Sequence, residues 1–243
     1  MIIRGLLTLG IDDTDALDSP GTSLLARDLA AHLAPLWKTR LITRHQLLKD
    51  PRVPSTKNNG CVALTLHPID SADEGNLFDQ AAKFVTAQSA EGSDPGLCLL
   101  SGDGVEKIAE FGRRCQSELT TQSEAHEVAV DAGVRLQGLG GTRDGVIGAL
   151  AAVGLVRTEN DGRVILVGDA TTDHHLVSGL EQVERLPSFG VDEVRLQGDG
   201  MKVLHGRVEL GKRLRPCLRD RKVVLYVTPS QQPGVDWHAQ RVL

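Results

Sequence analysis

The sequence predicts an α/β or α+β fold, because short apolar stretches alternate with amphipathic ones and the core residues are aliphatic. Of 243 residues, 40% are hydrophobic but only 3% are aromatic. A core of Leu, Val, Ile and Ala suits helices packed on sheets better than a small aromatic sandwich. This length accommodates one large domain or two small ones. A polar stretch at 116–123 indicates a boundary, with domains at 1–118 and 119–243.

The first half of the chain alternates strands and helices. Residues 2–11 are apolar and β-prone. After a turn at 18–21, leucines repeat every four residues from Leu25 to Leu33, which predicts a helix with one apolar face. Further strands are expected at 39–46, 61–67 and 97–100, and further helices at 74–90 and 104–115. Turn-forming residues predict a loop at 47–60.

The second half contains a helix at 124–132, a glycine-rich loop at 138–145 and a helix of small residues at 146–154. A strand is expected at 163–167. Strand-like stretches follow near Val194, near Val203 and at 223–227.

Composition excludes several classes of protein. The net charge of -5 argues against indiscriminate coating of nucleic acid. The cysteines contain no C-x-x-C pair, so neither a zinc ribbon nor a thioredoxin-type motif is expected, and we predict reduced, buried thiols. No export signal is evident, and no apolar run approaches the ~20 residues that span a bilayer. We therefore expect a cytosolic protein without a membrane partner.

Three carboxylates follow the first predicted strand at Asp12, Asp13 and Asp15. Such crowded acids repel one another unless a cation or several donors neutralise them. Mg²⁺ typically bridges one or two carboxylates to substrate phosphates. The sequence therefore indicates a magnesium site for ATP, and the alternative is a solvated turn after a strand.

Two loops offer a cradle for phosphate. Glycines let backbone N–H groups approach a phosphate where a helix begins, and a Lys-Asn-Asn-Gly loop adds a cation and amides. The candidate cradle comprises Lys57, Asn59, Gly60, Gly140, Gly141 and Gly145. Neither loop is a Walker A motif, and both are also explained as structural turns, with the small residues after Gly145 serving close helix packing.

The strongest basic cluster lies near the C-terminal end of the sequence. Its members are Lys212, Arg213, Arg215, Arg219, Arg221 and Lys222. This cluster is suited to RNA phosphate, but a solvated edge explains it as well.

A phosphatase is the second functional hypothesis. The Asp13-Thr14-Asp15 segment, together with the strand that ends at Asp169 and the later Asp173, imitates the strand-end acids of haloacid dehalogenase phosphatases. Leu17 departs from that pattern, which wants Thr or Val there. A non-catalytic nucleotide-binding module is the third hypothesis.

Five segments together resemble the archaeal tRNA(Ile) agmatinylcytidine synthetases, in the family's order and at similar spacing across most of the chain. These segments are Gly10 to Asp15, Thr22-Ser23, Pro54 to Gly60, Asp94-Pro95-Gly96 and Gly145 to Gly154. The resemblance implies a kinase-like ATP- and Mg²⁺-binding domain followed by a ferredoxin-like domain. It also implies phosphorylation of the C2 carbonyl of cytidine, after which an amine displaces the phosphate.

By this resemblance Thr22 accepts phosphate, beside Asp12, Asp13 and Asp15 as catalytic metal ligands. Thr14 and Ser23 are included among the nucleotide-binding candidates. A hydroxyl at a helix N-terminus near a metal-bound triphosphate is a reasonable acceptor, although a plain N-cap also explains Thr22. The expected enzyme is an ATP-dependent ligase or phosphotransferase acting on a cytidine-like or small-molecule acceptor.

The sequence departs from the family pattern in three places. It shows no counterpart of the family's OB-type and zinc-ribbon domains, so we expect the usual tRNA-binding parts to be missing, and tRNA and a homo-oligomer remain open as partners. The loop ending at Gly60 keeps one cation and loses a glycine. Before the helix the family carries Gly-Arg-Gly where this chain has Arg143-Asp144-Gly145, which adds a carboxylate, so either this loop is rearranged or Asp144 points away.

Overall fold

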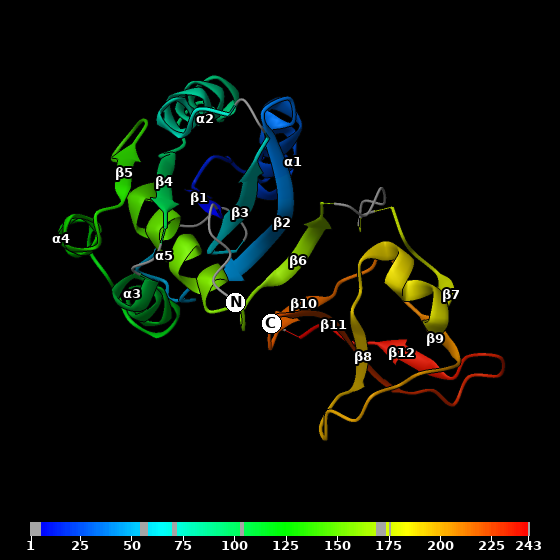
Figure 1. Ribbon diagram of the computed structural model, residues 1–243. Helices are drawn as coiled ribbons and strands as arrows, with labels where there is room; N and C mark the ends of the chain where they lie inside the picture. Colours follow the sequence, from blue (N-terminus) through cyan, green and yellow to red (C-terminus); the bar gives the residue numbers. More distant parts are fainter. Residues whose placement is uncertain are drawn as a thin grey trace. The chain divides into compact units, whose positions relative to one another are not determined.

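The computed structural model describes residues 6–53, 58–69, 72–102, 105–168, 174 and 176–242. They form two compact units, Met1–Thr158 and Glu159–Leu243 (Figure 1). Each unit is described separately below.

The first unit is a five-stranded antiparallel sheet with helices on both faces. Its strands are β1 (Leu7–Asp12), β2 (Trp37–Gln46), β3 (Gly60–Pro68), β4 (Gly96–Ser101) and β5 (Arg135–Gly138). Its helices are α1 (Thr22–Leu33), α2 (Glu74–Gln88), α3 (Val105–Ser117), α4 (Gln122–Ala132) and α5 (Gly145–Arg157). The strands lie in the order β5-β4-β1-β3-β2, and neighbouring strands are antiparallel.

The segment from β1 to β4 follows the chain order β1-α1-β2-β3-α2-β4 with spatial order β4-β1-β3-β2. This is the split β-α-β arrangement of ferredoxin-like folds. It lies in the first unit, whereas the resemblance placed a ferredoxin-like domain at 119–243. The difference arises because the two β-α-β crossovers are both complete by Ser101.

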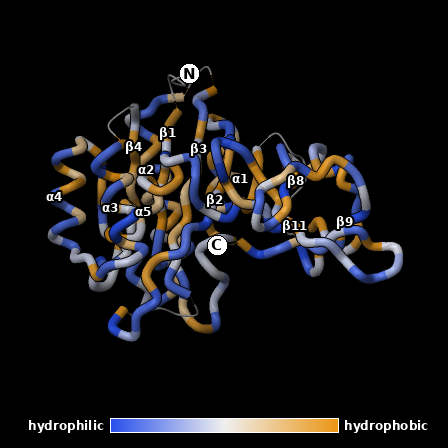
Figure 2. The backbone as a smooth tube through the Cα atoms, turned by 90° about the horizontal axis from the view of Figure 1, so that it is seen from below, coloured by the Kyte–Doolittle hydropathy of each residue, from blue (hydrophilic) through white to orange (hydrophobic). Residues whose placement is uncertain are grey.

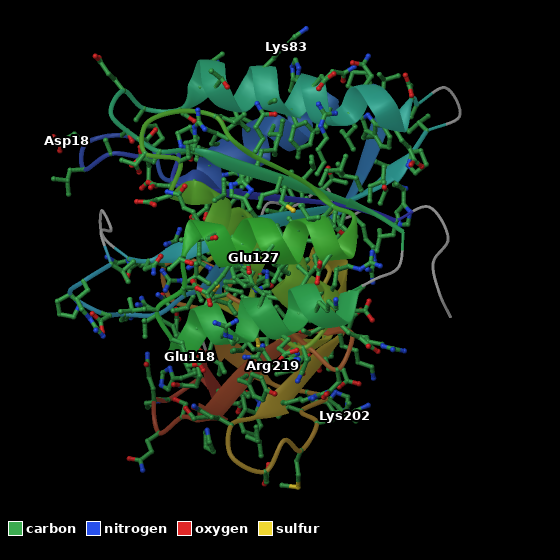
Figure 3. All side chains as sticks on the ribbon, turned by 90° about the vertical axis from the view of Figure 1, so that its left-hand side faces the viewer. Asp18, Lys83, Glu118, Glu127, Lys202 and Arg219 are labelled. Atoms are coloured by element: carbon green, nitrogen blue, oxygen red, sulfur yellow. The ribbon has the colours of Figure 1, made fainter. Side chains whose placement is uncertain are left out.

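Helices α1 and α2 cover one face of this sheet, while α5 covers the other and carries α3 and α4 on its outer side (Figure 1). The hydrophobic stretches gather in the interior, along β1, β3 and α5 (Figure 2). Lys83 on α2 and Glu127 on α4 point outward from these layers (Figure 3). The first unit is therefore a three-layer α/β/α structure.

Close contact between α5 and the sheet depends on glycines. A Cβ on Gly10 of β1 would lie 2.0 Å from the carbonyl oxygen of Ala149, and one on Gly96 would lie 2.1 Å from the carbonyl carbon of Gly145. At the other end of α5, a Cβ on Gly154 would lie 2.1 Å from the carbonyl oxygen of Ile108 in α3. The prediction that the small residues serve close helix packing is confirmed.

The units divide at 158/159, whereas the sequence suggested a boundary at 118/119. The polar segment 116–123 is a short connection between α3 and α4, not a linker. Thr121 and Glu124 form a capping box there, which begins α4 directly. Because α5 packs against β1 and β4, residues 122–157 belong to the first unit.

The second unit is built mainly from short strands. They are β6 (Arg163–Val167), β7 (Leu180–Gln182), β8 (Glu193–Leu196), β9 (Arg207–Glu209), β10 (Cys217–Arg219), β11 (Lys222–Pro229) and β12 (Trp237–Ala239), with a 3₁₀ helix η1 (Val183–Phe189). The strands lie in the order β6-β10-β11-β12-β9-β7, and β8 pairs in parallel with β11. Within its described residues the unit has no α-helix.

The core of the second unit is aliphatic, with Leu186, Val208 and Leu225 fully buried. Val203 belongs to this core, and the strand-like stretch predicted near it is an isolated antiparallel bridge between Lys202 and Arg195. The prediction of buried, reduced cysteines is confirmed, because all four thiols are buried and free. Among the helices formed by described residues, none combines the length and the apolar composition needed to cross a bilayer.

Candidate functional site

The acidic loop begins where β1 leaves the sheet. Asp12 is the last residue of β1 and lies opposite Gly96 of β4. Asp13 then takes a left-handed conformation with φ 52°, which turns the chain out of the sheet, and Asp is among the residues that tolerate it. Both side chains are partly buried. The strand therefore delivers the carboxylates of Asp12 and Asp13 at its C-terminal end, as the sequence predicts.

The carboxylate of Asp12 lies against the backbone of α5. A Cβ on Gly148 would be 1.7 Å from Asp12 Oδ2, so only glycine fits at this position of the helix. Burial raises the pKa of Asp12 to about 7, with further increases from the charges of Asp13 and Asp15. The guanidinium of Arg44 on β2 opposes this shift. Asp12 is therefore held where its charge is unfavourable.

Asp13 is surrounded by acids from three segments of the chain. Burial raises its pKa to about 6, and the charges of Asp94, Asp15 and Asp144 add to the increase. Asp94 precedes β4, and Asp144 stands immediately before α5. Gln122 donates a hydrogen bond of 2.5 Å to Asp144 Oδ1, which positions that side chain. The charge of Asp144 thus acts on Asp13.

Two threonines connect the loop to α1. Thr14 Oγ1 donates to Thr22 Oγ1 over 3.1 Å, and Thr22 Oγ1 donates to Asp15 Oδ1 over 3.0 Å. Both threonines are buried, at 2% and 6% exposure. The N-cap of α1 is Gly21, so Thr22 is the first helical residue, and the plain N-cap interpretation is wrong. Ser23 follows at the second helical position and is partly exposed.

The glycine-rich loop already binds an anion, which is the carboxylate of Asp94. The backbone N–H of Thr142 donates to Asp94 Oδ1 over 2.5 Å, and Thr142 Oγ1 donates to Oδ2 over 3.0 Å. Gly141 has φ 52°, and a Cβ there would be 1.5 Å from Asp94 Oδ1. Gly145 donates its N–H to the carbonyl oxygen of Asp94 over 3.1 Å. Gly140 lies nearby against Pro95.

The second candidate loop is closed by hydrogen bonds of Asn59. Its Nδ2 donates to the carbonyl oxygen of Leu48 over 2.9 Å, and its carbonyl oxygen accepts from the backbone of Leu47 over 3.0 Å. A Cβ on Gly60 would be 2.7 Å from the carbonyl oxygen of His45. These residues close the base of the loop, and Lys57 lies outside the described residues.

The carboxylates suit a cation that is shared with a ligand. Within the described ranges, no group of three or more His, Cys, Asp or Glu side chains is arranged to hold a metal ion by itself. Mg²⁺ commonly needs only one or two carboxylates, because waters and substrate phosphates supply its other ligands. Burial and, next to it, the neighbouring acids raise the pKa values of Asp12 and Asp13, and a bound cation would offset this unfavourable charge.

The sequence did not identify Arg44, Asp144 or Gly148 as site residues. The sequence feature that could have identified Gly148 is its position in the small-residue helix, because a helix that packs closely against a strand-end acid requires a glycine there. Asp144 was noticed only as a departure from a family pattern. Arg44 carries no motif, since it reaches the site through the antiparallel pairing of β2, β3 and β1.

The first unit is thus an α/β unit whose candidate site combines three features. These are carboxylates at the end of a strand, a buried threonine at the start of a helix, and a glycine loop. The chain is related over 61% of its length to the tRNA(Ile2) 2-agmatinylcytidine synthetases TiaS. It is 31% identical over 156 residues to the Pyrococcus horikoshii protein and 30% identical over 158 residues to that of Thermococcus sibiricus. It spans 35% of the length of each, so the relationship covers about a third of these enzymes.

Solved structures give the same result. A tRNA fluorescent labeling enzyme matches 61% of this chain and 36% of its own, with a TM-score of 0.55 and 26% identity. A TiaS complex with tRNA(Ile2) and ATP matches 62% of this chain and 36% of its own, with a TM-score of 0.55 and 25% identity. No family model matches the chain. The resemblance predicted from the sequence is therefore confirmed, and this chain is a relative of TiaS over about a third of the length of that enzyme.

Proposed function

We propose that the first unit is an ATP- and Mg²⁺-dependent phosphoryl-transfer core that activates a carbonyl or amide acceptor for attack by an amine. Its acceptor is cytidine-like or a small molecule. The observation that carries this proposal is the hydrogen-bonded set of Asp15, Thr22 and Thr14 beside the crowded carboxylates of Asp12 and Asp13. The relationship to TiaS, one structure of which contains tRNA and ATP, supports it.

In this proposal Asp12 and Asp13 hold the metal that accompanies the nucleotide. When bound, the metal neutralises charge on the phosphates and orients them for in-line transfer. Gly148 leaves room for the Asp12 carboxylate beside α5. Arg44, whose charge acts on Asp12, is a second cation available to this site.

Asp15 is the proposed general base for Thr22. The Thr22 hydroxyl already donates its proton to Asp15 Oδ1 over 3.0 Å. As the Thr22 oxygen bonds to the transferred phosphorus, the bond from phosphorus to the ADP leaving oxygen breaks and the hydroxyl proton passes to Asp15. The start of α1 favours the anionic product, because a helix N-terminus carries partial positive charge.

Gly140, Gly141 and Gly145 remain the proposed cradle, with one addition. Since Asp94 occupies the donors of Thr142, a nucleotide phosphate would have to displace that carboxylate before the loop could bind it. Repulsion among Asp13, Asp94 and an incoming phosphate opposes this exchange unless a cation accompanies the phosphate, which is the role proposed for Mg²⁺. Ser23, Asn59, Gly60 and Lys57 are further nucleotide-binding candidates in this proposal.

The proposal is tested by incubating the protein with Mg²⁺ and ATP labelled on the γ-phosphate. Wild type and Thr22→Ser should acquire protein-bound label, whereas Thr22→Val should bind ATP without acquiring it. Ser123→Ala is the matched control, because it removes an exposed hydroxyl at the second position of another helix, α4, and should leave the label intact. Absence of both nucleotide binding and label in the wild type contradicts the proposal. Saturable ATP binding without label or turnover would instead support a non-catalytic nucleotide-binding module.

The phosphatase hypothesis is not tested by the described residues, because Asp169 and Asp173 lie outside them. It predicts hydrolysis of an aryl phosphate without nucleotide, abolished by Asp13→Asn. A lack of that hydrolysis retires it.

A tRNA is the proposed macromolecular partner, since it is bound in a structure of the related enzyme. A gel-shift titration over a range of salt tests this, because phosphate contacts weaken steeply as salt rises. Binding that does not change with salt would contradict phosphate recognition.

A further inference from the structure

A cavity of about 220 Å³ in the second unit is lined largely by basic side chains. It lies between the connection from β9 to β10 and the segment that begins at β12. Its charged and titratable lining residues are Lys212, Arg213, Arg215, Arg241, His238 and Glu209. Four of these six carry a permanent positive charge at neutral pH, and one is an acid.

The cations in this cavity are close enough to repel one another. Burial lowers the pKa of Arg215, and the charges of Arg213 and Arg241 lower it further. Within the described part of the chain, Lys212, Arg215 and Arg241 form no ion pair. Glu209 accepts a hydrogen bond from the backbone N–H of Gly211 over 2.9 Å. Four crowded cations beside a single carboxylate, that of Glu209, are unfavourable unless a further anion joins them.

The other members of the basic cluster are engaged elsewhere. Arg221 pairs with Glu159 over 3.0 Å, and Lys222 contacts Glu193. Arg219 donates to the carbonyl oxygen of Asn160 over 3.2 Å. The cluster seen in the sequence therefore divides into a structural part, in which the cations have protein partners, and the cavity part.

We propose that this cavity binds a phosphate group, either of a small phosphorylated molecule or of a polynucleotide backbone. Arginine presents a planar fork of donors that matches phosphate oxygens, and several cations suit a dianion better than a single carboxylate. The volume admits one phosphate with part of its substituent. The site lies in the second unit and is independent of the function proposed for the first.

Calorimetric titration of the full chain tests this, in buffer free of Mg²⁺ and ATP, with three probes in separate arms. These are inorganic phosphate, acetate at equal ionic strength and a single-stranded RNA oligonucleotide. Arg215→Gln and Arg241→Gln remove cavity cations. Arg241 is exposed, so its substitution does not threaten the fold. Arg185→Gln is the matched control, because Arg185 lies in the same unit outside the cavity and pairs with Glu181.

Phosphate should bind, and each cavity variant should weaken it about tenfold, as expected for a lost hydrogen bond between charged groups. The control should not change the affinity. Tighter binding of RNA, with a salt slope that falls by about one in Arg241→Gln, identifies a polynucleotide as the source of the phosphate. Phosphate binding without RNA binding identifies a small ligand. Equal binding of acetate, unchanged binding in both cavity variants, or no binding of phosphate or RNA overturns the proposal.

Discussion

Asp12→Asn should stabilise the protein in the absence of metal. The pKa of Asp12 is raised from 3.8 to about 7 by burial and by neighbouring acids. Because the pKa of Asp12 is higher in the folded than in the unfolded state, protonation of Asp12 favours folding. This stabilisation is fully present below pH ~4 and is lost as pH rises through ~7. Asn keeps the size of the side chain and its hydrogen-bonding oxygen but never ionises.

The size of this effect follows from the pKa shift. Each pKa unit corresponds to 1.36 kcal/mol, so a shift of roughly three units sets an upper limit of about 4 kcal/mol. Asp12 is only partly buried by surface area, and screening with relaxation should halve this value. We expect Asp12→Asn to raise the free energy of unfolding by about 2 kcal/mol at pH 8 and by about half of that at pH 5.

Urea unfolding at pH 5 and pH 8 in the presence of a chelator measures this directly. Asp18→Asn is the control, because Asp18 lies exposed on the same loop (Figure 3) and its substitution should change the free energy of unfolding little. Added Mg²⁺ and ATP should stabilise wild type and not Asp12→Asn. An Asp12→Asn protein that is less stable than wild type at pH 8, or a stabilisation that is the same at both values of pH, would refute the reasoning.

Two further predictions concern the packing around the site. Gly148→Ala puts a methyl 1.7 Å from Asp12 Oδ2 and should weaken Mg²⁺-dependent ATP binding about tenfold in calorimetry. Gly154→Ala is the comparison, because its methyl meets a backbone oxygen of α3 at 2.1 Å, away from Asp12. It should lower the free energy of unfolding in urea by about 2 kcal/mol and leave the ATP affinity unchanged. Equal affinities for the two variants would contradict the role given to Gly148. Asp94→Ala removes the anion held by Thr142 and should cost about 1 to 2 kcal/mol, with faster protease cleavage at the glycine loop. Unchanged cleavage would show that this carboxylate does not secure the loop.

Most elements of the first unit could be predicted from local patterns. The apolar run before Asp12, the leucine repeat from Leu25 to Leu33 and the small-residue helix at 146–154 correspond to β1, α1 and α5. Short strands were missed, because β5, β7, β9, β10 and β12 contain at most four residues each and show little alternation. Their pairing is set by partners distant in sequence, which periodicity does not reveal.

The candidate site could be predicted only where its residues are close in sequence. Asp12, Asp13, Asp15 and Thr22 are close in sequence, and the structure brings their side chains into one connected set. Asp94 and the glycine loop meet through the packing of β4 against α5, and no local pattern predicts that the loop binds a carboxylate of its own chain. The predicted domain boundary at 118/119 differs from the observed one at 158/159 for the same reason, because the packing of α5 against β1 and β4 determines where the first unit ends.

The claim on which the proposed function depends is that Asp12 and Asp13 hold a divalent cation together with a nucleotide. Calorimetric titration of ATP at pH 8, with and without Mg²⁺, tests it in wild type and in the double variant Asp12→Asn with Asp13→Asn. Mg²⁺ should tighten ATP binding at least about tenfold in wild type and leave the double variant unaffected. ATP affinity that does not depend on Mg²⁺ in wild type, or that keeps its full Mg²⁺ dependence in the double variant, would contradict the claim.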